Sequence, residues 1–185
     1  QRQEPMEMEG KTLGLLGCGK IARVTARKAS QGLSMQVIAY SPSLRQDKVP
    51  KYIKVVSRAD VFRLADFVSV NLPATATTKG SIGSEEFAMM KDTAFFINTA
   101  RGSIVIENEL IEAITKKKIA GAAIDVFEEE PPKTNNELLH LPNVLASPHS
   151  AAQTKEARYR VSLQLAEEIF RALQKRTLKW PVNKL

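Results

Sequence analysis

The stretch Gly17-Cys18-Gly19-Lys20-Ile21-Ala22 decides the fold, because it carries the pattern G-x-G-x-x-G/A between an apolar run and a helical segment. Gly17 permits a tight turn, Gly19 lets the backbone approach a pyrophosphate, and Ala22 lets the helix pack near the strand. The N-terminus of a helix also offers unpaired N–H groups and a partial positive charge to phosphates. We therefore predict a loop that binds the pyrophosphate of a dinucleotide. The predicted contact residues are Gly17, Gly19, Lys20 and Ile21.

Short apolar runs alternate with segments of helical spacing on both sides of this loop. Residues 12–16 precede it as a buried strand, and residues 35–40 follow its helix as a second one. This alternation indicates βαβ units and a parallel sheet, and runs apolar on both faces fit strands covered by helices on each side. We predict an α/β fold, a Rossmann-type doubly wound parallel sheet with helices on both faces. Further strands are expected at residues 52–56, 67–71, 94–98, 122–125 and 144–146, and helices at residues 21–30 and 107–115.

The composition is that of an ordinary globular chain, with 185 residues, 43% hydrophobic and 25% charged. We predict a single domain over residues 1–185. The single cysteine, Cys18, excludes an internal disulfide and fits a reducing, cytoplasmic setting. We interpret it as a small filler residue, with a low-pKa thiol at a helix N-terminus as the alternative. The chain contains no apolar run near 18 residues, so no membrane span is expected.

The net charge of +7 raises the question of a polyanionic partner. The basic residues are scattered, apart from Lys116-Lys117-Lys118 near an expected helix end, where cations are favourable. We do not expect a nucleic-acid partner, because affinity for phosphorylated ligands explains the sign of the charge equally well. No metal site is predicted.

The segment at residues 154–174 has the spacing of a long amphipathic helix. Val161, Leu165, Ile169 and Leu173 recur every four residues and form one apolar stripe. We predict that this stripe packs on the domain, with a dimer contact as the alternative.

The position that binds the ribose departs from the usual pattern. An acidic residue is expected about 20 residues after the loop, at the end of the second strand, but Ser41 stands there. A carboxylate at this point would bind the ribose hydroxyls of NAD and repel a 2′-phosphate. Without it, and with Arg45 and Lys48 nearby, NADP becomes tolerable beside NAD.

Four stretches of the chain are similar to those of one known family. In chain order, they are residues 10–21, Asn98-Thr99-Ala100-Arg101-Gly102, Ala123-Ile124-Asp125-Val126-Phe127-Glu128-Glu129-Glu130-Pro131, and the segment from Leu141-Pro142-Asn143-Val144 to Ser147-Pro148-His149. The chain closely resembles the cofactor domain of D-isomer-specific 2-hydroxyacid dehydrogenases, the group that contains D-3-phosphoglycerate dehydrogenase.

The resemblance implies three catalytic residues. Arg101 would grip the substrate carboxylate and polarise its carbonyl, a task that suits a planar and permanently charged guanidinium. His149 would act as the acid/base, because a histidine titrates near the working pH. Glu130 would pair with this histidine, orient its ring and favour its protonated form.

The resemblance also implies contacts with a nicotinamide cofactor. Asp125 matches a residue that contacts the nicotinamide amide, and its alternative is a turn cap. Pro73 and Thr99 are further predicted cofactor contacts. Ser150-Ala151-Ala152 replaces a stretch with small glycines and could crowd the nicotinamide, and Ile106 replaces an aspartate that could cap a helix.

The predicted activity is hydride transfer between the cofactor and a D-2-hydroxyacid or 2-keto acid. We favour 3-phosphoglycerate, because Thr154-Lys155-Glu156-Ala157 resembles phosphoglycerate dehydrogenases. A glyoxylate/hydroxypyruvate reductase is the nearest alternative, and a cofactor-sensing module like a corepressor is the alternative of another class.

The resemblance leads us to expect that the family's separate substrate domain is absent from this chain, because only about ten residues precede Lys11. We therefore expect a fragment of a two-domain enzyme, with negligible turnover alone, from a parent that is a homodimer or larger.

Overall fold

The computed structural model describes residues 6–181. The chain divides into two compact units, Gln1–Pro148 and His149–Leu185. The two ends of the domain predicted over residues 1–185 lie outside the described residues, and that extent stays a prediction.

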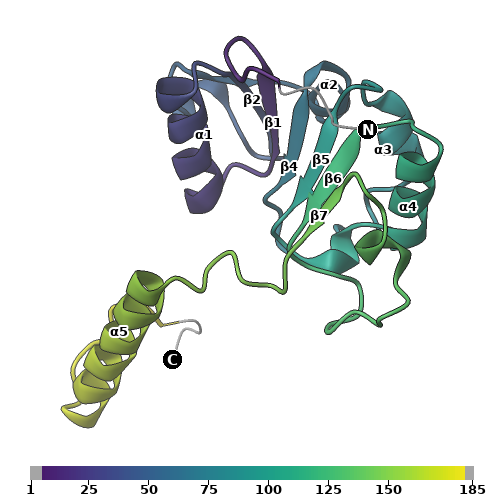
Figure 1. The fold of residues 1–185 in the computed structure, drawn as a ribbon. Helices are drawn as coiled ribbons and strands as arrows, with labels where there is room; N and C mark the ends of the chain where they lie inside the picture. Colours follow the sequence, from purple (N-terminus) through teal and green to yellow (C-terminus); the bar gives the residue numbers. More distant parts are fainter. Residues whose placement is uncertain (1–5, 182–185) are drawn as a thin grey trace. The chain divides into compact units, whose positions relative to one another are not determined.

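The first unit is built on a sheet of seven strands in the order β3-β2-β1-β4-β5-β6-β7, and every neighbouring pair is parallel (Figure 1). The chain runs outward from β1 to β3 on one side, then returns to β4 on the other side of β1. This reversal creates a topological switch point between β1 and β4. The predicted doubly wound sheet is confirmed. Its strands are β1 (Thr12–Leu16), β2 (Gln36–Tyr40), β3 (Ile53–Val55), β4 (Phe67–Val70), β5 (Phe95–Asn98), β6 (Gly121–Ile124) and β7 (Val144–Ala146).

Helices cover both faces of the sheet, with α1 on one side and α2, α3 and α4 on the other (Figure 1). The central strand explains why two layers are needed, since Leu15 and Leu16 point to opposite faces and are both fully buried. Leu15 belongs to the apolar cluster under α1, and Leu16 to the larger cluster under the other helices. The helices are α1 (Lys20–Gly32), α2 (Arg58–Leu64), α3 (Ser84–Met89) and α4 (Glu107–Thr115).

Three short 3-10 helices complete the unit: η1 (Gln46–Lys48), η2 (Gly102–Ile104) and η3 (Glu137–Leu139). The helices α1 and α4 match the segments predicted from spacing, and α4 begins after Ile106 without a side-chain cap.

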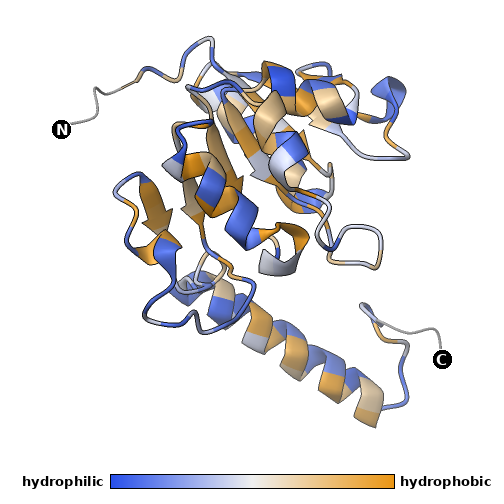
Figure 2. Cartoon of the chain, turned by 90° about the vertical axis from the view of Figure 1, so that its right-hand side faces the viewer, coloured by the Kyte–Doolittle hydropathy of each residue, from blue (hydrophilic) through white to orange (hydrophobic). Residues whose placement is uncertain are grey.

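The second unit contains α5 (Lys155–Leu173), which begins where the Thr154 hydroxyl accepts a hydrogen bond from the Ala157 N–H. Figure 2 shows apolar and polar residues alternating along this helix in the predicted amphipathic pattern. Val161, Leu165 and Leu173 are exposed by 60% or more, so the partner of the stripe, domain or second chain, stays a prediction. Among the described residues, no helix is long and apolar enough to cross a membrane.

A polar network joins α2 to α3 on the outer layer of the first unit. The Arg58 guanidinium contacts the Glu86 carboxylate at 2.7 Å and donates to the Ser81 carbonyl. Glu86 also accepts from the Gly83 N–H at 2.9 Å, which caps the start of α3. Burial acts to raise the pKa of Glu86. The hydrogen bonds from Arg58 and Gly83 and the charge of Arg58 nevertheless hold that pKa below its ordinary value.

A lowered pKa in the folded state means that Glu86 stabilises the fold above its ordinary pKa, near 4.5, and that this stability is lost as the pH falls through the lowered value. We expect Glu86→Gln to lower the free energy of unfolding by about 1–2 kcal/mol at neutral pH. The difference from wild type should shrink as the pH falls below about 4.5. The control is Glu85→Gln, since Glu85 is exposed on the same helix turn. Urea titrations between pH 3 and pH 7 measure the effect, and an equal loss in both variants would contradict it.

Candidate functional site

The glycine loop between β1 and α1 has the geometry that an anion-binding turn requires. Gly17 has a φ of +92°, a backbone conformation that residues with a side chain rarely adopt. Its N–H donates to the Tyr40 carbonyl at 2.8 Å. A Cβ on Gly17 would lie 2.6 Å from the Asn71 carbonyl oxygen, so glycine is required for packing as well as for backbone conformation.

Gly19 differs, because it is the exposed N-cap of α1. Outside its immediate neighbours, no heavy atom lies within 4 Å of the position that a Cβ would take. No side chain caps the first turn of α1, and no acidic residue lies in that turn. A 13-residue helix thus begins without a side-chain cap and beside an open backbone position, which is an arrangement suited to binding a phosphate.

A crevice of about 750 Å³ opens beside this helix start. Its walls come from the carboxyl ends of three central strands: the loop after β1, the segment after β4 and the segment after β5. It therefore lies at the switch point of the sheet, where α/β proteins of this type bind their ligands. Six predicted residues line it together: Gly19, Lys20, Ile21, Pro73, Thr99 and Arg101.

Cys18 lies in the glycine loop with 8% of its surface exposed. Burial raises the pKa of its thiol, against a smaller opposing effect of the Arg23 charge. These properties favour the interpretation as a small filler residue over that of a low-pKa thiol.

The buried side chain of Asn98 shapes the loop that carries Arg101. Its amide nitrogen donates to the Arg101 carbonyl at 3.0 Å, and its amide oxygen accepts from the Ala100 N–H at 3.0 Å. Asn98 is 1% exposed, so this brace is fixed within the core. The Arg101 side chain itself is exposed and donates to the Ala100 carbonyl at 2.6 Å. The buried amide of Asn98 thus holds the backbone of Arg101, whose guanidinium is exposed, at the edge of the crevice.

Asp125 follows β6 at the same edge of the sheet and is 3% exposed. The Ser147 hydroxyl, at the end of β7, donates to its carboxylate at 2.5 Å. The Asp125 N–H donates to the Asn98 carbonyl, which ties the end of β6 to the end of β5. Ser41 follows β2 beside the glycine loop. Asp125 and Ser41 are not among the residues that line the crevice.

The structure places Glu130 in the first unit and His149 in the second. Glu130 is exposed, and its carboxylate accepts from the Phe127 N–H at 3.1 Å. His149 has a φ of +49°. Among the described residues, the other non-glycine residues with positive φ follow the C-terminus of a helix, where this conformation is common. At His149 no helix end explains it, and such outliers cluster at functional sites. The pairing of Glu130 with His149 stays a prediction.

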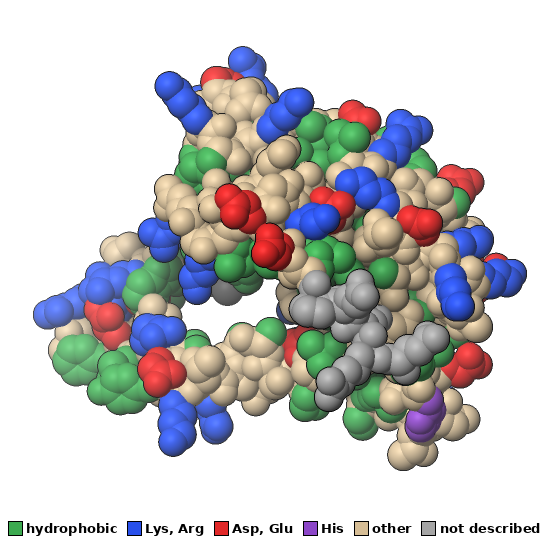
Figure 3. Space-filling model, turned by 45° about the horizontal axis from the view of Figure 1, so that its top comes forward, with side chains coloured by type: hydrophobic (Ala, Val, Ile, Leu, Met, Phe, Trp, Pro, Cys, Tyr) green, Lys and Arg blue, Asp and Glu red, His purple; other side chains and the backbone are tan. Residues whose placement is uncertain are grey.

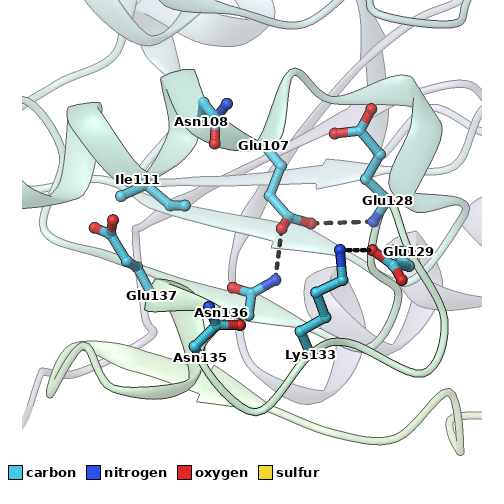
Figure 4. Close-up of a pocket in the computed structure, with 9 residues that line it drawn as sticks. All are labelled: Glu107, Asn108, Ile111, Glu128, Glu129, Lys133, Asn135, Asn136 and Glu137. Carbon is cyan, nitrogen blue, oxygen red and sulfur yellow. Dashed lines mark hydrogen bonds and ion pairs between the residues drawn. The ribbon is translucent and has the colours of Figure 1, made fainter.

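A second cavity, of about 410 Å³, lies between α4 and the loop that follows β6 (Figure 4). The Glu107 carboxylate accepts from the Asn136 amide at 2.6 Å and from the Glu128 N–H at 3.0 Å, and Lys133 pairs with Glu129. These contacts hold the loop after β6 against α4. The cavity lining contains more glutamates than lysines. The negative charge of this cavity disfavours anionic ligands such as dinucleotides and hydroxyacids.

On the face drawn in Figure 3, lysine and arginine side chains lie over several parts of the surface, and acidic side chains lie among them. Positive and negative charges are therefore interspersed on this face. The described residues also contain no group of three or more His, Cys, Asp or Glu side chains that could hold a metal ion.

A doubly wound parallel sheet, a glycine turn at a helix start and a crevice at the switch point together define a dinucleotide-binding domain. Residues 1–151 match the family model described as "D-isomer specific 2-hydroxyacid dehydrogenase, NAD binding domain". The chain belongs to this family, whose members are NAD(P)-dependent oxidoreductases.

Relatives with known names agree with this assignment. The chain is 40% identical over 165 residues to a D-3-phosphoglycerate dehydrogenase of Archaeoglobus fulgidus, covering 89% of this chain and 31% of that protein. It is 40% identical over 169 residues to a hydroxypyruvate reductase of Thermotoga maritima, covering 90% and 54%. The crystal structure of a D-lactate dehydrogenase with NAD+ from Lactobacillus jensenii superposes with a TM-score of 0.89 at 29% identity, covering 97% and 57%. The chain thus spans about a third to about half of these relatives.

Several residues of the site were not predicted from the sequence, and Val70, Ala74 and Ala100 of the crevice lining are among them. Asn71 and Leu72 line the crevice after β4, and Asn98 braces the loop of Arg101. Asn71 and Asn98 each follow or end a buried strand, so a polar residue at the carboxyl end of an apolar run is the signal that could have found them.

Proposed function

We propose that this chain is the cofactor domain of a D-2-hydroxyacid dehydrogenase acting on 3-phosphoglycerate. One observation carries the proposal: the open helix start at Gly19, preceded by the left-handed turn at Gly17, faces a crevice at the switch point. The glycines fit a dinucleotide, because the backbone at Gly17 and Gly19 carries no side chain at the point where a pyrophosphate must approach. When bound, the nicotinamide ring supplies the hydride chemistry.

The proposed roles of the chain's own residues follow from their chemistry. Arg101, held at the crevice edge by Asn98, binds the substrate carboxylate through its planar fork. His149 donates a proton to the carbonyl oxygen of the keto acid and takes it back in the reverse direction. Glu130 orients the imidazole and favours its charged form. Asp125 accepts from the carboxamide of the cofactor, with Ser147 holding its carboxylate.

The substrate choice is supported by the stretch Thr154-Lys155-Glu156-Ala157 and by similarity to a protein named as a D-3-phosphoglycerate dehydrogenase. Equal similarity to a hydroxypyruvate reductase and the replacement of the ribose carboxylate by Ser41 favour glyoxylate or hydroxypyruvate as the alternative. An activity assay on a protein that joins this chain to a substrate domain separates the two candidate substrates. It compares the rate of NAD+ reduction with 3-phosphoglycerate and the rate of NADH oxidation with hydroxypyruvate.

Calorimetric titration of the 185-residue chain with NADH tests the cofactor site directly. We expect saturable binding with one site per chain, because the first-turn amides of α1 are free of side-chain caps. Binding should weaken when inorganic pyrophosphate is added as a competitor. The absence of any heat of binding at millimolar NADH would contradict the proposal.

A further inference from the structure

The segment between β4 and α3 forms one wall of the crevice, and a single threonine hydroxyl holds its backbone. Pro73 and Ala74 of this segment line the crevice together with the start of α1. The Thr78 hydroxyl donates to the Pro73 carbonyl at 2.6 Å and accepts from the Thr75 N–H at 2.7 Å. These two groups belong to the peptide units on either side of Ala74, so one side chain fixes the backbone that lines the crevice.

The rest of the segment forms a turn around this hydroxyl. The Thr78 and Lys79 N–H groups both donate to the Thr75 carbonyl, at 3.1 Å and 3.0 Å. The Thr75 and Thr78 hydroxyls lie 3.0 Å apart, and Gly80 ends the turn with a φ of +59°. Residues 73–80 are exposed apart from the half-buried Thr78. Hydrogen bonds, rather than apolar packing, therefore determine the conformation of this wall.

The far end of the segment is attached to the loop that carries Arg101. The Gly80 N–H donates to the Ser103 carbonyl at 2.9 Å, two residues after Arg101. Ile82, two residues after Gly80, is fully buried and anchors the chain in the core. The segment thus extends from the crevice wall to the Arg101 loop, and Thr78 lies between its two attached ends.

We propose that Thr78 is a positioning residue of the cofactor site, which holds the wall at Pro73 and Ala74 in its binding conformation before the dinucleotide arrives. A wall that is already ordered need not lose conformational entropy on binding, so this preorganisation raises the affinity for the cofactor. Thr78 is not among the residues that line the crevice, and it acts through the backbone of those that do. The proposal rests on the proposed dinucleotide site and goes beyond it, because it assigns a role to a residue behind the wall.

The first test compares Thr78→Val and Thr78→Ser in the 185-residue chain by calorimetric titration with NADH. Valine has nearly the shape of threonine but no hydroxyl, so Thr78→Val should weaken NADH binding about three- to tenfold, the equivalent of about one hydrogen bond. Serine keeps the hydroxyl, so Thr78→Ser should bind NADH within about twofold of the wild type.

Amide hydrogen exchange separates this role from a general loss of stability. In Thr78→Val, the Thr75 N–H loses the hydroxyl that accepts its hydrogen bond, and it should exchange about threefold faster or more in the free chain. Saturating NADH should then slow its exchange, because binding orders the wall. In the wild type the same N–H is held before binding, so NADH should slow its exchange less than in the variant.

The matched control is Thr115→Val on α4, where a threonine hydroxyl also donates to a backbone carbonyl, that of Ile111 at 2.8 Å. This variant should keep wild-type affinity for NADH, since Thr115 does not line the crevice. Unchanged NADH affinity in Thr78→Val, or wild-type exchange at Thr75 in that variant, overturns the proposal. An equal loss of affinity in Thr78→Ser or in Thr115→Val also overturns it. Failure of the wild-type chain to bind NADH would instead overturn the proposed function.

Discussion

Replacing Gly19 by alanine is expected to weaken NADH binding about ten- to 100-fold while the fold stays intact. The added methyl group stands between the backbone and the pyrophosphate, and it removes about one charge-assisted hydrogen bond of about 1.5–3 kcal/mol, which corresponds to the expected change in affinity. Within the folded chain that methyl group meets open space, since no heavy atom beyond its neighbours lies within 4 Å. The cost to stability should stay below about 1 kcal/mol, the loss from placing alanine at a helix N-cap.

The matched control is Gly32→Ala at the other end of α1, which adds the same methyl group to open space away from the crevice. Calorimetry with NADH measures the affinity of both variants for the cofactor, and thermal unfolding measures their stability. Wild-type affinity in Gly19→Ala would mean that the pyrophosphate does not approach this backbone. An equal loss of affinity in Gly32→Ala would mean that α1 acts only through its stability.

Replacing Gly102 by alanine is expected to lower the free energy of unfolding by at least about 3 kcal/mol, the largest effect on stability that we expect in this chain. A Cβ at this position would lie 1.9 Å from the Phe127 carbonyl oxygen and 2.5 Å from the Glu128 nitrogen. These are backbone atoms, so no rotamer change can relieve the overlap. The loops after β5 and β6 must separate, and Phe127, which is 5% exposed, must leave its packing.

Urea unfolding followed by circular dichroism measures this loss, with Gly32→Ala as the control for the same chemical change. A decrease in melting temperature of about 10 °C corresponds to the expected loss in a chain of this size. A loss below about 1 kcal/mol would show that the two loops do not touch in solution. Since these loops carry Arg101 and Glu130, the Gly102 contact also holds together the two loops on which these proposed catalytic residues lie, after the neighbouring strands β5 and β6.

Much of the cofactor site could be predicted from the residues that form it. The spacing of Gly17, Gly19 and Ala22 after an apolar run depends on local turn geometry, and the structure places that turn as expected, with Gly17 at positive φ. The seven strands were also predicted, because a buried strand appears as a short apolar run in the sequence itself. The helices α2 and α3, of seven and six residues, were not predicted, because they are too short to show a clear helical period.

Local sequence therefore determined the strands, the three longer helices, the phosphate-binding turn and the family to which the chain belongs. Tertiary structure alone decided which strand ends meet: the crevice between β1, β4 and β5, the Asn98 brace, and the contact of Gly102 with Phe127. Periodicity and turn preference depend on residues that are neighbours in the sequence, whereas these contacts join residues that are far apart in the chain. Their closeness follows from the order of strands in the sheet, which no single segment encodes.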